Sequence, residues 1–150
     1  MAINDKNDKQ IQDLLENNYP LKAIKVDFND LNNKTFIIKT AFSEGYKKLE
    51  NFSDWYYIVK LNLIGNCIDL IGLVSFEFDE QHFLKLNWIE TNKVFKKKMF
   101  SKEILDYLKL YVKWIHAKGI KVKNYENNIV LFKLNDFKLD KGAMVWQIGY

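Results

Sequence analysis

Three runs of strand-forming residues occupy the centre of the chain. Trp55–Leu61 and Cys67–Phe78 are rich in aromatic and β-branched residues, and the stretch Asn62–Asn66 between them contains a glycine. Such residues favour strands, and a short glycine-containing connection favours a hairpin. After a turn at 79–81, the run Phe83–Ile89 alternates apolar and polar positions, with the apolar ones at Phe83, Leu84, Leu86 and Trp88. The three segments predict an antiparallel meander.

From about Phe100 the spacing of apolar residues becomes helical. One face of the predicted helix carries Ile104, Leu105, Leu108, Tyr111, Val112 and Ile115. This spacing is typical of an amphipathic helix that covers a sheet, and Gly119 is expected as the glycine that follows its C-terminus. Beyond it the pattern predicts a strand at Ile120–Tyr125, a short helix at Asn127–Leu134 and a terminal strand at Met144–Ile148.

The N-terminal third predicts fewer elements. Leu21–Phe28 alternates as a strand does, and Lys34–Leu49 has the apolar spacing of a helix that we expect to be broken at Gly45. Residues 1–19 are expected to form an extension with a short amphipathic helix at Gln10–Asn17. Because the chain contains no repeat or linker, we expect residues 1–150 to form one α/β domain.

Composition supports a soluble globular domain and excludes several other classes. Apolar residues make up 48% of the 150 residues and charged residues 28%. No apolar stretch approaches a membrane span, and the polar segment Met1–Gln10 does not resemble a secretory signal, so we expect a cytoplasmic protein without a membrane partner. The single cysteine, Cys67, excludes an internal disulfide, and His82 and His116 lack ligand spacing, so no metal site is expected.

Charge is distributed unevenly along the chain. All 23 basic residues are lysines, and residues 1–80 hold 9 Lys against 13 acidic residues (−4), whereas residues 81–150 hold 14 against 6 (+8). The second half is therefore suited to receive an anion. The absence of arginine, which reads guanine and clamps phosphate with two hydrogen bonds, argues against a nucleic-acid partner.

Three lysines stand immediately before the start of the longest predicted helix. Lys96, Lys97 and Lys98 precede Ser101, although a helix N-terminus carries a partial positive charge and favours acidic neighbours. A bound anion would remove this conflict, because backbone amides would cradle it and lysines would neutralise it. The alternative is a solvated lysine run with Ser101 as an ordinary cap.

The order of these elements resembles the GNAT-family N-acetyltransferases. Three segments carry the resemblance, which covers about residues 20–150. The first is Trp55–Val59 with Ile71–Phe76, which is similar to the family's "wyyVa…ivGfv" hairpin. The second is Leu86–Glu90 followed by the lysine-rich loop (residues 96–101), and the third is Asn127–Phe137, which is similar to "N…A…LYeklGF". The resemblance implies an α/β fold with a mixed sheet, an antiparallel meander, splayed central strands and helices on both faces. It also implies transfer of an acetyl group from acetyl-CoA, as co-substrate, to a small-molecule or peptide amine.

The resemblance further implies which residues bind the cofactor. Pantetheine would lie against the splayed strand and the last helix, and the pyrophosphate against the lysine-rich loop. Carried over to this chain, the cofactor-binding residues are Trp88, Ile89, Glu90, Lys96, Lys97, Lys98, Met99, Phe100, Ser101, Asn128 and Phe132. Two positions depart from the family pattern: Met99 replaces the first loop glycine, and Phe132 replaces a tyrosine that acts as general acid in many members.

Amine acetylation at neutral pH benefits from a general base, because an amine with a pKa near 10 is mostly protonated. Glu90 is our candidate base, with a solvated strand-end carboxylate as the alternative, and Glu77 and Asp79 are weaker candidates. Tyr125 is the candidate acid, although a structural role or a proton from solvent remains open. A non-catalytic GNAT-like binding or oligomerisation module is the alternative function. A homodimer is also a prediction, with the terminal strand ending at Tyr150 as its pairing segment.

Overall fold

The computed structural model describes residues 20–28, 37–61, 67–95 and 100–148. Its strands are β1 (Leu21–Lys25), β2 (Trp55–Leu61), β3 (Cys67–Phe78), β4 (Leu84–Thr91), β5 (Gly119–Val122), β6 (Lys138–Asp140) and β7 (Ala143–Gln147). Its helices are α3 (Ser43–Tyr46), α4 (Ser101–Trp114) and α5 (Ile129–Leu134), with 3₁₀ turns at Leu49–Asn51 and Glu126–Asn128. The predictions for Gln10–Asn17, for the turns at 29–33 and 62–66, and for Lys96–Met99 lie outside the described residues.

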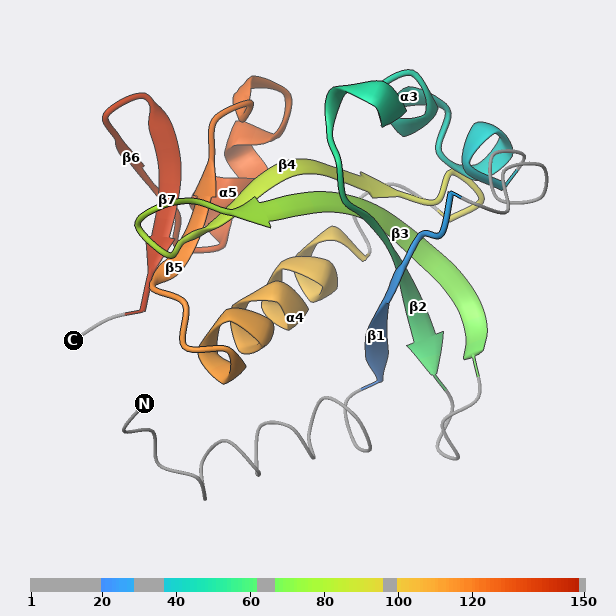
Figure 1. The fold of residues 1–150 in the computed structure, drawn as a ribbon, viewed down its shortest axis with the longest axis horizontal. Coiled ribbons are helices and arrows are strands. Elements are labelled where there is room, and N and C mark those ends of the chain that lie inside the picture. Colours follow the sequence, from blue (N-terminus) through green and yellow to red (C-terminus); the bar gives the residue numbers. More distant parts are fainter. Residues whose placement is uncertain (1–19, 29–36, 62–66, 96–99, 149–150) are drawn as a thin grey trace.

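One seven-stranded sheet runs through the molecule in the order β1-β2-β3-β4-β5-β7-β6. Strands β1 to β4 pair antiparallel, as the meander predicts, and β4 pairs with β5 in parallel. Figure 1 shows α4 across one face of the sheet and α3 across the other. The expected α/β fold with a mixed sheet and helices on both faces is therefore confirmed.

Each face of the sheet covers its own hydrophobic core. The larger core lies on the α4 side and includes the fully buried Ile104, Leu105 and Leu108. The smaller core lies on the α3 side and is centred on Trp55 and Phe42. Burying apolar side chains on both faces is what makes the central strands rich in apolar residues at every position.

A β-bulge in β4 changes which face its side chains occupy. Ser75 pairs with Trp88 and Phe76 pairs with Leu86, so Asn87 is an extra residue without a partner in β3. The simple alternation expected from the sequence is therefore wrong at this point: Leu86 belongs to the α4 core, whereas Trp88 packs on the α3 core. A bulge reorients side chains in this way because it inserts one residue into a period of two.

The helix over 37–46 is interrupted at a different residue from the one expected. Residues 37–41 are helical, Phe42 has φ −136° and ψ 67°, and α3 then begins at Ser43 with Gly45 inside it. The expected break at Gly45 is wrong. Phe42 is fully buried in the smaller core, so packing of its ring accompanies the interruption.

The C-terminus of α4 is closed by His116 and not by Gly119. His116 has φ 62°, its N–H donates to the Lys113 carbonyl, and the Ala117 N–H donates to the Val112 carbonyl. These two bonds define a Schellman motif with a non-glycine residue in the left-handed position. The expectation for Gly119 is wrong because that residue already belongs to β5, where it pairs with Gln147.

Gly119→Ala is expected to destabilise the fold by about 2–3 kcal/mol, because an added Cβ overlaps the backbone of β7. That Cβ would collide with the Trp146 carbonyl oxygen and lie 2.8 Å from the Gln147 Cα. Thermal unfolding should show a lower midpoint by roughly 4–10 °C. Gly142→Ala is the matched control: Gly142 has φ 81° but open space around it, so only backbone strain of about 1 kcal/mol is expected. Equal midpoints for the Gly119 variant and the parent would contradict the prediction.

The terminal strand β7 is covered on its outer side over part of its length. β7 pairs with β5 on one side, and among the described residues β6 pairs with Ala143–Val145 on the other. The expected pairing of the segment Trp146–Tyr150 with a second copy is not tested by this arrangement and stays a prediction. The edge on this side is β6, whose three residues are exposed. A homodimer itself stays a prediction.

Candidate active site

A cleft opens where β4 and β5 separate. The two strands pair only at Leu84 with Ile120 and at Lys85 with Lys121, and β4 then continues to Thr91 without a partner on that side among the described residues. Unpaired strand edges present backbone N–H and C=O groups to a ligand. The splayed strands expected from the sequence are thus present.

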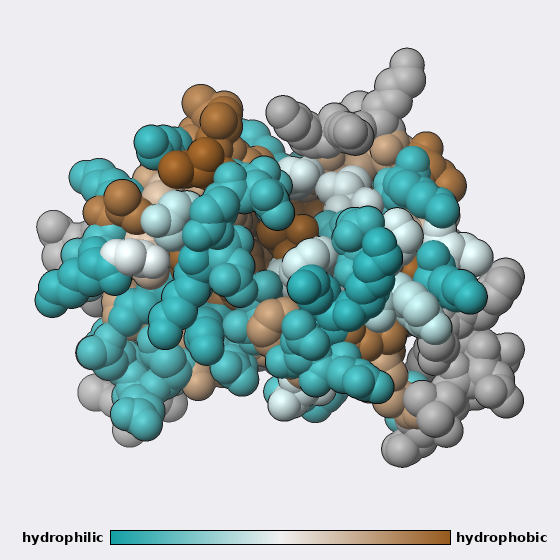
Figure 2. Space-filling view, turned by 90° about the horizontal axis from the view of Figure 1, so that it is seen from above, coloured by the Kyte–Doolittle hydropathy of each residue, from teal (hydrophilic) through white to brown (hydrophobic). Residues whose placement is uncertain are grey.

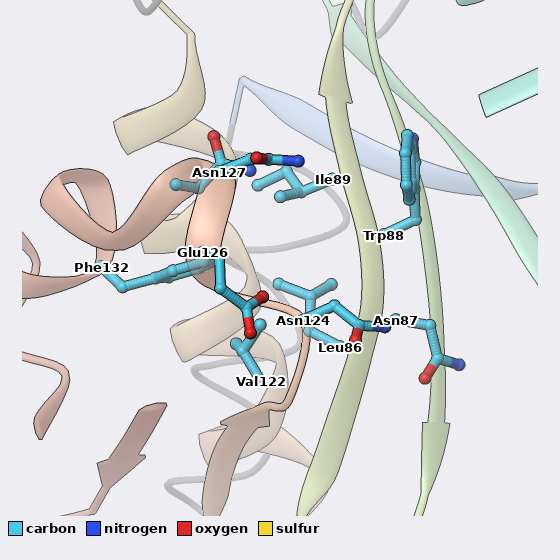
Figure 3. A pocket seen from close by; sticks show the side chains of 10 residues that line it. Leu86, Asn87, Trp88, Ile89, Val122, Asn124, Glu126, Asn127 and Phe132 are labelled. Carbon is cyan, nitrogen blue, oxygen red and sulfur yellow. The ribbon is translucent and has the colours of Figure 1, made fainter. Parts of the chain in front are cut away.

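The cleft contains a cavity of about 110 Å³. Its walls come from β4, from the end of β5 and from α5, and the residues that line it are Leu86, Asn87, Trp88, Ile89, Val122, Asn124, Glu126, Asn127, Asn128 and Phe132. Figure 3 shows the side chains of Leu86 and Ile89 on the side of β4 that faces Phe132, and those of Asn87 and Trp88 on the opposite side. The bulge at Asn87 accounts for this division, since it places two consecutive side chains on one face.

Four of the predicted site residues meet at this cavity: Trp88, Ile89, Asn128 and Phe132. Sequence reasoning missed four polar residues there: Asn87 at the bulge of β4, and Asn124, Glu126 and Asn127 after β5. Figure 3 places the Glu126 side chain in front of Phe132, toward the middle of the cavity. The available clue was position: a polar run directly after a central strand lies at the strand's carboxyl end, where α/β sheets bind ligands.

The α5 wall is joined to α4 by the side chain of Lys109. The Lys109 ammonium donates to the Asn135 carbonyl at the end of α5 (2.6 Å) and lies 5.7 Å from the centre of the Phe137 ring. Burial lowers the pKa of Lys109 below its usual value. Asp136 follows with φ 70°, and the Phe137 N–H donates to the Phe132 carbonyl, so the helix ends in a second Schellman motif. Phe132 itself is 1% exposed and packs on Phe137.

The ends of the lysine-rich loop are brought together by two contacts. The rings of Phe95 and Phe100 meet edge to face at 5.0 Å, and the hydroxyls of Thr91 and Ser101 lie 3.2 Å apart. Ser101 is the first residue of α4, so it is not the N-cap. Phe100 holds that position without a side-chain cap bond.

Glu90 is tied to the α3 side of the sheet. Its Oε1 accepts the Gly45 backbone N–H at 2.7 Å and the Trp88 indole N–H at 2.9 Å. The carboxylate follows directly after the cavity residue Ile89 but does not line the cavity. Tyr125 does not line it either: its partly buried ring packs against the larger core, just before the 3₁₀ turn.

Figure 2 views the molecule from the α3 side. This face is mostly hydrophilic, with apolar surface exposed in its middle and in separate areas toward its margins. Within the described residues no helix is long and apolar enough to cross a bilayer, and no cluster of three His, Cys, Asp or Glu side chains could hold a metal ion.

Comparison with known proteins identifies the fold. No model of a protein family and no curated protein matches the chain. Among solved structures, the chain is similar to Tetrahymena GCN5, with a TM-score of 0.58 and 14% identity over 85% of this chain and 96% of that one. It is also similar to the GNAT family N-acetyltransferase YhbS from Escherichia coli in complex with CoA, with a TM-score of 0.55 and 8% identity over 87% of this chain and 82% of that one. A third match is the dodecameric spermidine N-acetyltransferase from Vibrio cholerae, with a TM-score of 0.54 and 14% identity over 85% of this chain and 94% of that one.

These identities are low, so the likeness concerns architecture. The chain has the GNAT fold, as the resemblance in the sequence predicted. Its cleft between β4 and β5 lies in a seven-stranded mixed sheet of that fold.

Proposed function

We propose that the protein is an acetyl-CoA-dependent N-acetyltransferase that acetylates an amine by direct attack. The observation that carries this proposal is the separation of β4 from β5 after Lys85 in a GNAT fold, which opens a cleft along an unpaired strand edge. Solved structures of this fold include a complex with CoA, which supports the choice of co-substrate.

The cleft suits a thin, extended ligand. Its cavity of about 110 Å³ is well below the ~300–1,000 Å³ of pockets that enclose compact ligands. An acylated pantetheine arm could lie along the edge of β4 at Trp88 and Ile89, with Asn128 and Phe132 opposite. The phosphates would then reach the lysine-rich loop, where the proposed binding residues are Lys96, Lys97, Lys98, Met99, Phe100 and Ser101.

The reaction needs one base and one acid. Glu90 would take one proton from the ammonium form of the acceptor, and the lone pair of the neutral nitrogen then forms the bond to the acetyl carbon while the carbon–sulfur bond breaks. The nitrogen loses its second proton to solvent as the amide forms. The leaving thiolate takes up a proton, for which Tyr125 or a water molecule is the donor. Tyr125 lies at the start of the 3₁₀ turn whose residues line the cavity, so it is close in sequence to the cleft.

Calorimetric titration with acetyl-CoA tests the proposal directly. We expect saturable binding below millimolar concentration, as is usual for enzyme substrates. At about a hundredfold excess over Kd, the free energy of unfolding should rise by about 2.7 kcal/mol. Acetate alone should bind undetectably. Absence of both heat and thermal shift with millimolar acetyl-CoA would refute the proposal.

The acceptor is proposed as a primary amine of a small molecule or a peptide. Release of free thiol from acetyl-CoA, measured across a panel of polyamines, aminoglycosides and peptides, would identify its class. We propose that the protein acts in the cytoplasm, in line with its single cysteine, Cys67.

Phe132 favours a second candidate, a non-catalytic binding or oligomerisation module. A phenylalanine ring has no proton to donate, and here it is buried against Phe137. Binding of acetyl-CoA without thiol release across the whole amine panel would support this module. Turnover with any amine would exclude it.

A further inference from the structure

The carboxylate of Glu90 is held by two N–H donors from different elements. The Gly45 backbone amide and the Trp88 indole both donate to Oε1, at 2.7 and 2.9 Å. Among the described residues both hydrogen bonds of this carboxylate fall on the same oxygen. Charge-assisted bonds of this kind are short and directional, so they hold the side chain in one orientation.

The Gly45 N–H is available to Glu90 because the helix is interrupted at Phe42. Within a continuous helix, the amide of residue 45 would bond to the carbonyl of Ala41. That carbonyl instead accepts the N–H of Lys93 at 3.2 Å, just beyond β4. The end of β4 and the segment that follows it therefore satisfy both groups released by the break: the carbonyl through Lys93 and the amide through Glu90.

Gly45 also provides the space that the carboxylate occupies. A Cβ at this position would lie 3.0 Å from Glu90 Oε1, 2.8 Å from Leu73 Cδ2 and 3.2 Å from Trp88 Nε1. All three distances are shorter than ordinary van der Waals contacts. Glycine is thus required here for close approach, and not for an unusual backbone conformation.

We propose that Gly45 and Trp88 are positioning residues that clamp Glu90 through Oε1 and leave Oε2 to take the proton of the acceptor amine. The inference rests on the proposed function, in which Glu90 is the base, and it assigns a role to α3. Docking of α3 on β4 orients the base, and a displaced α3 would leave the base misaligned. A misplacement of about 1 Å can cost roughly a hundredfold in rate.

Nuclear magnetic resonance can test the clamp without any activity. The Gly45 amide and Trp88 indole proton resonances should shift together on acidification, with one common midpoint set by protonation of Glu90. Glu90→Gln should abolish both titrations. Glu44→Gln is the matched control: Glu44 is the neighbouring carboxylate on α3, is exposed and pairs with Lys47 at 3.4 Å, so both titrations should persist. Different midpoints, or titrations that survive Glu90→Gln, would overturn the clamp.

Kinetics then test the positioning role with the amine that the panel identifies. Trp88→Phe removes one donor and should lower kcat about tenfold, and Gly45→Ala should lower it by about 10- to 100-fold. Calorimetric affinity for acetyl-CoA should stay within twofold in Gly45→Ala, whose site lies outside the cofactor cleft, and Ser43→Ala on the exposed side of α3 is the control. An unchanged kcat in a folded Trp88→Phe variant would overturn the positioning role. Loss of acetyl-CoA binding by the parent protein would instead refute the proposed function, while the resonance titrations would still decide the clamp.

Discussion

Glu90→Gln is expected to lower kcat by about 10²- to 10⁴-fold at neutral pH, with acetyl-CoA affinity unchanged. The amide has nearly the same shape, and its oxygen can still accept the N–H groups of Gly45 and Trp88. It cannot take a proton from the acceptor, which is mostly an ammonium ion at pH 7. Steady-state thiol release with the identified amine measures the loss, and calorimetry measures the affinity.

A second variant separates catalysis from stability. Glu90→Ala leaves the Gly45 and Trp88 donors without their acceptor, so the free energy of unfolding should fall by about 2 kcal/mol, whereas Glu90→Gln should cost less than 1 kcal/mol. Chemical denaturation distinguishes the two variants. If Glu90→Gln retains kcat within threefold, Glu90 serves only as the acceptor of the Gly45 and Trp88 N–H groups, and the base must be sought elsewhere.

The strongly patterned elements of the fold were predictable from local sequence. Trp55–Leu61 and Cys67–Phe78 are strands with the boundaries expected, because their aromatic and β-branched residues pack on both faces of the sheet. The bulge at Asn87 was not predictable. It depends on how β4 pairs with β3, and the apolar residues on either side suit a regular strand equally well.

The ends of the helices were predicted wrongly for a related reason. His116 and Asp136 adopt positive φ although neither is glycine, and a left-handed residue of this kind is rare enough that Gly119 was the more obvious choice. The hydrogen bonds of the two Schellman motifs offset this local strain. The hydrophobic pattern of the sequence reveals neither these motifs nor the burial of the Phe42 ring, at which the helix over 37–46 is interrupted.

The candidate site was predictable in part. Ile89 and Phe132 came from the family resemblance, and both line the cleft. Glu126 was missed because an exposed carboxylate in a polar run carries no pattern of its own. The clamp on Glu90 was also missed, since Gly45 lies 45 residues earlier in the chain and contributes only a backbone amide. The role of the lysine-rich loop stays a prediction.

Replacing Lys96, Lys97 and Lys98 together with alanine is expected to weaken acetyl-CoA binding by about a hundredfold. Each lysine beside a phosphate group contributes roughly 1 kcal/mol, and about 1.4 kcal/mol corresponds to a tenfold change in Kd. Their neighbour Lys102 would compensate little, since it pairs with Asp106 at 2.8 Å. Calorimetry should also show a weaker dependence of Kd on salt, because fewer charges remain to be screened.

The matched control is the triple variant Lys22→Ala, Lys118→Ala and Lys138→Ala, which removes the same charge from exposed positions elsewhere. Equal losses of affinity in the two triple variants would show that only the overall charge attracts the cofactor, and the loop would not be its phosphate site. The unliganded protein offers an independent check. Because the lysines oppose the partial positive charge at the start of α4, where Phe100 provides no side-chain cap, their removal should raise the free energy of unfolding by a few tenths of a kcal/mol each. A loop that stabilises the complex while destabilising the empty protein is what a dedicated anion site requires. If the lysines formed only a solvated face, their removal would weaken acetyl-CoA binding no more than the control triple variant does.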